Sequence, residues 1–85
     1  MTLEQLRRQI DRIDSKLLQL LNRRAALVLR IGEVKKKHSL PVFDGKRELA
    51  VLNRLMRSNP GPLSKKSIRD IFSGILRHNR RIQDS

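Results

Sequence analysis

The sequence predicts an all-α protein with three helices per chain, in a single domain spanning residues 1–85, and a very long N-terminal helix. Three stretches carry apolar residues at intervals of three and four, which is the spacing of an amphipathic helix. All three prolines, at positions 41, 60 and 62, fall between these stretches. No stretch has the alternating pattern of a β-strand, so the class is all-α.

The first helix is predicted from about Leu3 to about Lys37. Thr2 and Gln5 have the spacing of a capping box, which marks a helix start. No proline follows until residue 41. Gly32 lies inside the predicted helix, where a glycine lowers helix stability by only about 1 kcal/mol. The apolar seam consists of Leu3, Leu6, Ile10, Ile13, Leu17, Leu20, Leu27, Ile31 and Val34.

The length of this helix predicts a homodimer. A helix of about 35 residues is a rod of about 50 Å, whereas a compact globule of this chain length is about 30 Å across. The rest of the chain is too short to cover the whole rod. The uncovered apolar seam needs a partner, and the simplest partner is a second copy with the two long helices packed together.

Two shorter helices follow a connector at residues 38–44, HSLPVFD. The second helix begins around residues 44–46 and ends at NPGP, residues 59–62. Ser64 is a suitable N-cap for the third helix, which runs to near the C-terminus. Their apolar positions are Leu49, Val51, Leu52, Leu55 and Met56, then Ile68, Ile71, Phe72, Ile75, Leu76 and Ile82.

The chain is strongly basic, with 20 Lys and Arg against 8 Asp and Glu and a formal net charge of +12. This excess favours a nucleic-acid-binding module or a protein that binds a small anion, and part of it also suits solvated helix surface. Only Phe43 and Phe72 are aromatic, which weighs against stacking on single-stranded nucleic acid.

Several other classes of protein are disfavoured by composition. The chain has no cysteine, and His38 and His78 lie far apart, so we expect no metal site. No apolar run is long enough to span a membrane, and the N-terminus lacks the apolar run of a signal peptide. We therefore expect a cytoplasmic protein.

Polar residues take apolar positions in two of the helices. Arg24 lies on the seam of the first helix, where a buried charge needs an acidic side chain or a bound anion, unless it reaches solvent. Lys35 returns to nearly the same face eleven residues later, although it belongs to a run of three lysines that suits solvent. Asn79 and Gln83 continue the apolar face of the third helix, where fraying near the chain end would also explain them.

The segment VFDGKRE, residues 42–48, starts the second helix. Asp44, Arg47 and Glu48 share one face at positions i, i+3 and i+4. Arg47 and Glu48 precede apolar residues 51 and 52 by four positions, so they are predicted to point inward and Lys46 outward. The alternative is a solvated first turn whose acids suit the helix dipole.

The inward polar residues predict a cationic pocket inside a helical bundle. Arginine side chains bind carboxylates through two parallel hydrogen bonds. The pattern contains no nucleophile–base pair and no metal ligand set. Such a pocket suits anion binding, or a reaction that needs only shaping and electrostatics. The residues are Arg24, Lys35, Arg47, Glu48, Asn79 and Gln83.

The sequence resembles the all-helical chorismate mutase family over nearly its whole length. The matching stretches are LRRQIDRIDSKLLQLLNRR, KKKHSLPVFDGKRE and NRRIQ, and the most specific features are the interval from Arg24 to Lys35 and the segment PVFDGKRE. The resemblance implies an intertwined homodimer of three-helix chains. It also implies conversion of chorismate to prephenate by a Claisen rearrangement on the route to phenylalanine and tyrosine, with no cofactor.

The resemblance further implies roles for residues of the first and third helices. Arg24 would bind a substrate carboxylate. Arg7 would reach into the partner chain's pocket, and it lies about 25 Å from Arg24 along the same helix, too far to share one site within its own chain. Lys35 and Gln83 would hydrogen-bond the ether oxygen, where negative charge grows as the C–O bond breaks.

At the second helix, Glu48 would hold the substrate hydroxyl, Asp44 would contact the same region and Arg47 would support the ring-carboxylate side. Asn79 would be a further substrate-binding residue at a position where the family often has serine. Asparagine still donates a hydrogen bond, but its bulk and reach differ. Gly45 would loosen the helix start and favour mobility over the pocket.

Two other functions remain open from the sequence. An isochorismate pyruvate lyase has a similar helical dimer and cationic pocket. A basic helical dimer could instead bind nucleic acid, although this does not explain Glu48 and Gln83 on inward faces. The sequence does not decide between a free-standing enzyme and part of a fused one. Five arginines have no assigned role: Arg8, Arg12, Arg23, Arg80 and Arg81.

Overall fold

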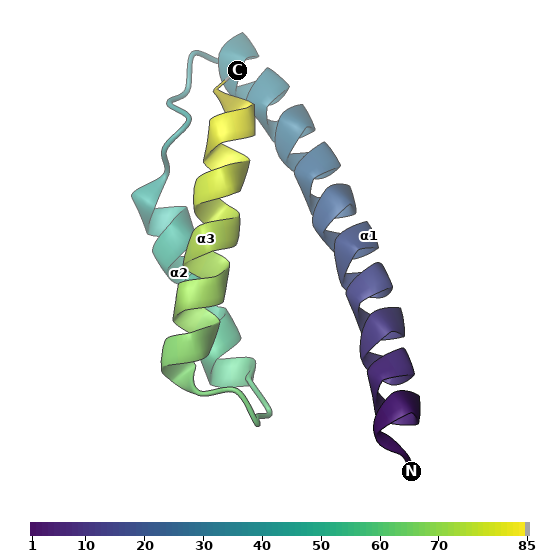
Figure 1. The fold of residues 1–85 in the computed structure, drawn as a ribbon. Helices are drawn as coiled ribbons and strands as arrows, with labels where there is room; N and C mark the ends of the chain where they lie inside the picture. Colours follow the sequence, from purple (N-terminus) through teal and green to yellow (C-terminus); the bar gives the residue numbers. More distant parts are fainter. Residues whose placement is uncertain (85) are drawn as a thin grey trace.

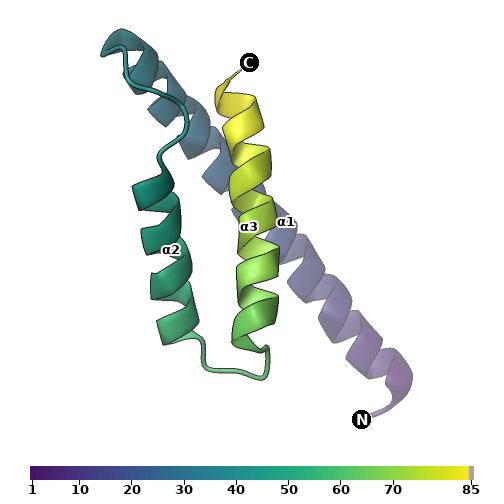
Figure 2. The ribbon, with the colours of Figure 1, turned by 90° about the vertical axis from the view of Figure 1, so that its left-hand side faces the viewer.

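The computed structural model describes residues 1–84 and confirms the predicted class and the order of the helices. α1 spans Leu3–Lys37, α2 spans Gly45–Ser58 and α3 spans Lys65–Gln83. The described residues contain no strand. α2 and α3 form an antiparallel pair, and α3 also packs against the C-terminal half of α1 (Figure 1, Figure 2).

Each helix begins at a side chain that accepts a hydrogen bond from the first turn. Thr2 and Gln5 exchange the two bonds of the predicted capping box, at 2.8 and 3.1 Å. Ser64 accepts from the backbone three residues later at 3.1 Å, as predicted. Asp44 caps α2 in the same way at 3.0 Å, so it precedes the helix rather than sharing its first turn.

The C-terminus of α1 turns sharply into the connector. Ser39 has a φ of 55°, in the left-handed region. Its N–H donates to the carbonyl of Lys36 at 3.2 Å, and the N–H of Leu40 donates to the carbonyl of Lys35 at 2.8 Å. This pair of bonds is a Schellman motif, which satisfies the last carbonyls of a helix. The connector therefore leaves α1 right beside Lys35.

The core is small and lies along α3, which packs against both other helices. Its buried apolar side chains are Val28 of α1, Val51 of α2, and Ile68 and Leu76 of α3. Gly32 of α1 is also buried, and a Cβ atom there would lie 3.3 Å from Cγ of Gln83. The missing side chain thus lets the end of α3 approach the backbone of α1.

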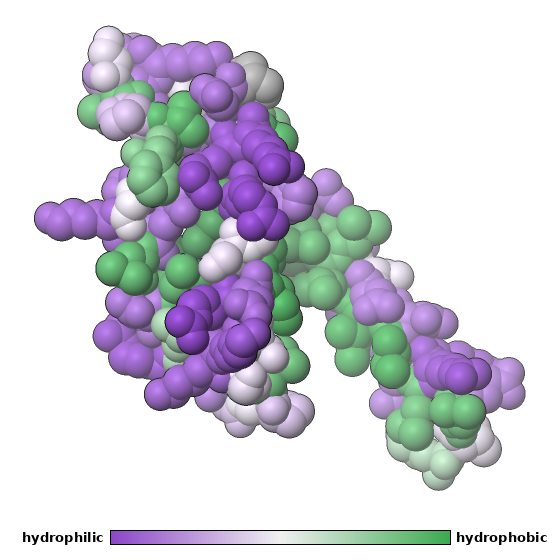
Figure 3. Space-filling view, turned by 60° about the vertical axis from the view of Figure 1, so that its left-hand side comes forward, coloured by the Kyte–Doolittle hydropathy of each residue, from purple (hydrophilic) through white to green (hydrophobic). Residues whose placement is uncertain are grey.

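The N-terminal half of α1 projects away from this core. We call residues 3–20 the arm, and every residue in it is exposed. Leu17 is 52% exposed and Ile13 is 61% exposed. Figure 3 shows apolar side chains along the projecting arm. The structure is 54 Å long, and its radius of gyration of 15.9 Å exceeds the roughly 12 Å of a compact chain of this length.

The arm therefore carries the uncovered apolar seam that the sequence predicted. A stripe of large apolar side chains in water is unfavourable and marks an interaction surface. None of the helices in the described part of the chain combines the length and the apolar character needed to cross a membrane.

Candidate active site

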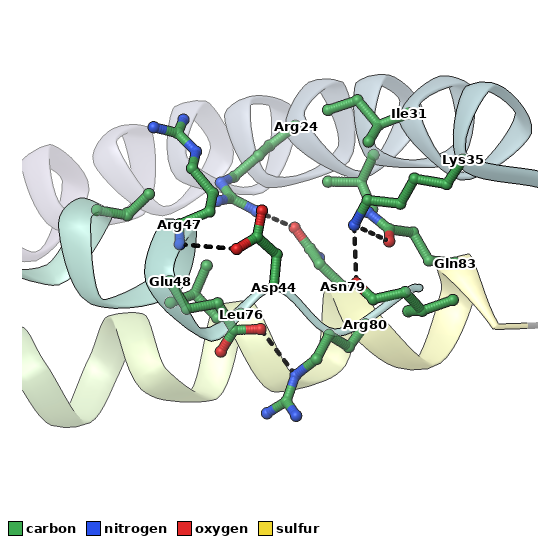
Figure 4. Close-up of a pocket in the computed structure, with 13 residues that line it drawn as sticks. Arg24, Ile31, Lys35, Asp44, Arg47, Glu48, Leu76, Asn79, Arg80 and Gln83 are labelled. Carbon is green, nitrogen blue, oxygen red and sulfur yellow. Dashed lines mark hydrogen bonds and ion pairs between the residues drawn. The ribbon is translucent and has the colours of Figure 1, made fainter. Parts of the chain in front are cut away.

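A pocket lies where the C-terminal half of α1, the connector, the start of α2 and the end of α3 meet (Figure 4). Its volume is about 260 Å³, just below the usual size of pockets for drug-sized ligands. Every predicted site residue except Arg7 contributes to its wall. The lining residues are Arg24, Val28, Ile31, Lys35, Val42, Asp44, Arg47, Glu48, Val51, Leu76, Asn79, Arg80 and Gln83.

Lys35 is held in the pocket by two acceptors. Its Nζ donates to the carbonyl oxygen of Val42 at 2.7 Å and to Oε1 of Gln83 at 3.1 Å. Lys35 and Gln83 are both half-buried, so neither behaves as a solvated surface residue or a frayed end. Because the Gln83 oxygen accepts from Lys35, its amide nitrogen remains a donor for a further acceptor.

Arg24 is held by the same kind of contact. Its Nη1 donates to Oδ1 of Asn79, and both residues are half-buried. The predicted burial of Arg24 on the seam is therefore partial. Its hydrogen-bonded partner in this contact is a neutral amide, which fixes the guanidinium without neutralising its charge. A half-buried guanidinium whose charge is not neutralised favours the binding of an anion.

Of the two side chains predicted to point inward at the start of α2, one is half-buried and both contribute to the pocket wall. Glu48 is half-buried, with its side chain 21% exposed, and Arg47 is exposed at the pocket wall. Lys46 is exposed and does not contribute to the wall. The Asp44 carboxylate accepts the Arg47 backbone N–H at 3.0 Å, so one of its oxygens serves the helix cap.

Gly45 has a packing role that the sequence did not indicate. A Cβ atom at this position would lie 3.2 Å from Cζ of the Phe43 ring. That distance is too short for ordinary contact, so the glycine lets the ring fold back over the start of α2. The predicted effect of Gly45 on mobility is a separate matter and stays a prediction.

Arg80 is the site residue that the sequence analysis missed. Its Nε lies 3.0 Å from Oε2 of Glu48, and its guanidinium lies 4.9 Å from the centre of the Phe43 ring. Arg80 follows the buried Leu76 by four positions, which puts both on one helix face. The predicted apolar face instead ran from Ile75 to Asn79, one residue away from the face that packs.

The pocket has an excess of positive charge. Four cationic side chains line it against the two carboxylates Asp44 and Glu48. One of those carboxylates is already paired with Arg80. Among the described residues, no group of three or more His, Cys, Asp or Glu side chains is arranged to hold a metal ion. The arrangement suits a small ligand with two negative charges.

Comparison with known proteins identifies the family. The sequence model described as Chorismate mutase type II matches residues 6–84. The chain belongs to the chorismate mutase type II family. The resemblance predicted from the sequence is thereby confirmed.

Solved structures of chorismate mutases have the same fold. Form II of the chorismate mutase from Thermus thermophilus superposes with a TM-score of 0.94 at 34% identity, over 95% of this chain and 92% of that one. The chorismate mutase from Helicobacter pylori in complex with prephenate superposes with a TM-score of 0.89 at 29% identity, over 96% of this chain and 89% of that one.

Some relatives in this family are much longer. A bifunctional chorismate mutase/prephenate dehydratase from Aquifex aeolicus is 47% identical over 57 residues, which is 67% of this chain and 16% of that protein. The chain spans between 16% and 21% of the length of the first curated relatives that it matches.

Proposed function

We propose that this chain is a chorismate mutase, which converts chorismate to prephenate in phenylalanine and tyrosine biosynthesis. The observation that carries the proposal is the half-buried cationic pocket around Arg24 and Lys35, in a chain of the chorismate mutase type II family. The similar Helicobacter pylori enzyme, which binds prephenate, supports it. Chorismate is a dicarboxylate and suits the excess positive charge of the pocket.

The reaction needs no nucleophile, acid or base from the protein. The ether C–O bond of chorismate breaks while a C–C bond forms in the same molecule, and no proton or electron passes to the enzyme. The protein can therefore act by holding the compact, reactive conformer and by stabilising developing charge. In this proposal Arg24 binds one substrate carboxylate, and Arg47 supports the ring carboxylate.

Lys35 and Gln83 are proposed to bind the ether oxygen. Negative charge grows on this oxygen in the transition state, so donors aimed at it increase the rate more than the affinity. The hydrogen bond from Lys35 to the Gln83 oxygen supports this role, because it leaves the glutamine nitrogen to donate.

Glu48 is proposed to accept a hydrogen bond from the substrate hydroxyl, with Asp44 contacting the same region. The Asn79 nitrogen is proposed to donate to the substrate carboxylate beside Arg24. The use of its oxygen by Arg24 supports this assignment, because the amide then presents its donor to the ligand. Asparagine thus offers both the acceptor and the donor at this position.

We also propose an intertwined homodimer in which Arg7 enters the partner's pocket. Arg7 is exposed on the arm and lies about 25 Å from Arg24, outside the pocket of its own chain. The exposed apolar seam of the arm supports a second copy as its cover. A cytoplasmic location and the absence of binding to nucleic acid or membranes stay predictions.

Incubation of the purified chain with chorismate tests the function. The ultraviolet absorbance of chorismate should fall without added metal or cofactor, and the product should be identified as prephenate. Isochorismate is the parallel substrate. Release of pyruvate and salicylate from isochorismate, with chorismate left intact, would contradict the mutase assignment and favour a lyase.

A further inference from the structure

We propose that Arg80 is a positioning residue, which holds the Glu48 carboxylate in the orientation that the substrate hydroxyl requires and ties Phe43 to α3. This inference rests on the proposed mutase function. It concerns a residue for which the sequence pattern offered no role. Arg80 and Glu48 both line the pocket, and the Arg80 guanidinium also contacts the ring of Phe43, which lies outside the lining.

The contact with Glu48 is close and partly shielded. Nε of Arg80 lies 3.0 Å from Oε2 of Glu48, and this nitrogen is itself buried from solvent. The two side chains are 39% and 21% exposed. Nε makes no hydrogen bond to the residues that the structure describes, so the attraction between Arg80 and Glu48 is mainly between their charges. Such a pair is screened less than an exposed surface ion pair.

A carboxylate that must accept one hydrogen bond from a ligand benefits from a fixed orientation. In metal sites, side chains that orient a ligating group contribute about ten- to a hundredfold to affinity or activity, and we expect an effect at the lower end of this range for an oriented carboxylate. Figure 4 shows Arg80 reaching Glu48 from α3, on the side away from α1. Arg80 contacts one carboxylate oxygen, Oε2, and the proposal assigns the other oxygen to the substrate hydroxyl.

The Phe43 ring gives Arg80 a second anchor. The guanidinium carbon lies 4.9 Å from the ring centre, within the range of a cation–π contact. Phe43 belongs to the connector, and the absence of a side chain at Gly45 allows its ring to fold back. Arg80 thus joins α3 to both the connector and the start of α2, which are the two segments that close the pocket on one side.

Steady-state kinetics with chorismate test the inference through two variants and a control. Arg80→Ala removes both contacts and should lower kcat/KM about tenfold. Most of this loss should appear as a higher KM, since the hydroxyl contact exists in the ground state and the transition state alike. Arg80→Lys keeps the charge but loses the planar group, so it should restore part of the loss. Arg81→Ala removes an exposed neighbouring charge outside the pocket wall and should leave the kinetics unchanged.

A double-mutant cycle with Glu48→Gln separates positioning from direct substrate contact. If Arg80 acts through Glu48, Arg80→Ala should cost less than about threefold once Glu48 is a glutamine. An equal loss in both backgrounds would overturn the inference, and so would a normal KM for Arg80→Ala. Helical content by circular dichroism verifies folding, and Arg80→Lys carries the test if the alanine variant unfolds. A wild-type chain without mutase activity would overturn the proposed function as well, whereas an active wild type with unchanged kcat/KM in the Arg80→Ala variant would overturn this inference alone.

Discussion

Two cations of the pocket are each fastened by an amide from α3. Lys35 donates to the oxygen of Gln83, and Arg24 donates to the oxygen of Asn79. In both pairs the amide oxygen faces the cation, so both amide nitrogens are available as donors. The pocket therefore presents a set of donors whose positions are fixed before any ligand binds, which is the condition for effective electrostatic stabilisation.

Replacement of Lys35 tests this set at the level of one side chain. Lys35→Ala removes a donor from the proposed ether-oxygen site and should lower kcat about 100- to 1000-fold, the usual effect of losing one such donor. Lys37→Ala is the matched control, because Lys37 is exposed at the end of the same helix and lies outside the pocket wall. Chorismate consumption by a Lys35→Ala variant at the wild-type rate would contradict the role of Lys35.

At the level of the elements, the close approach of α1 and α3 places Gln83. Gly32 is buried at this contact, and a Cβ atom there would lie 3.3 Å from Cγ and 3.5 Å from the carbonyl oxygen of Gln83. Gly32 and Lys35 are three residues apart, so they share one face of α1. The glycine thus sets the distance between the helices just where Lys35 meets its glutamine partner.

Gly32→Ala should separate stability from activity. Alanine favours the helix by up to about 1 kcal/mol over glycine, which offsets the crowding, so the midpoint of urea unfolding should change little. The Gln83 side chain must move by a few tenths of an ångström, and kcat should fall severalfold because its amide shifts relative to Lys35. Gly74→Ala is the control, since a Cβ atom there would lie 3.8 Å from its nearest neighbour, Nη2 of Arg77, which is ordinary contact. Unchanged kcat in the Gly32→Ala variant would show that Gln83 tolerates the shift.

The sequence was sufficient to predict the helices, because apolar spacing and caps are local signals. The Thr2 capping box, the Ser64 cap and the connector at residues 38–44 all appear in the structure. The inward faces of Lys35, Glu48 and Gln83 also followed from helical periodicity. These signals are local and do not depend on the contacts between helices.

The contacts between elements were beyond the reach of periodicity. Both Ile75 and Leu76 are apolar, and only packing against the neighbouring helices makes Leu76 the buried one. Because Leu76 is the buried residue, Arg80, four positions later, lies on the face that lines the pocket, which the periodicity did not predict. The fit of the Phe43 ring against Gly45 likewise depends on the path of the connector in space.

At the level of the whole molecule, the chain divides into a packed end and an arm. The arm includes all residues from 3 to 20, and all of them are exposed. Apolar surface on this scale is unusual for a monomer and destabilises an isolated helix in water. The proposed homodimer accounts for both the arm and the position of Arg7.

A charge on the seam should disrupt this association. Leu17→Glu puts a carboxylate on a face that the proposed dimer buries, so sedimentation velocity should show monomers and the helical signal in circular dichroism should fall. Ser15→Glu adds the same charge about 200° around the helix and should remain dimeric. A monomeric wild-type chain, or a dimeric and active Leu17→Glu variant, would contradict the proposed interface.

Arg7 lies so far from the pocket of its own chain that, in the proposed dimer, every site is assembled from two polypeptides. Arg7→Ala and Lys35→Ala homodimers would then each have two defective sites. When the two variants are mixed and allowed to exchange subunits, each mixed dimer should contain one intact site and one doubly defective site. Two nearly inactive preparations should therefore regain activity together, as in complementation between two defective alleles of one gene.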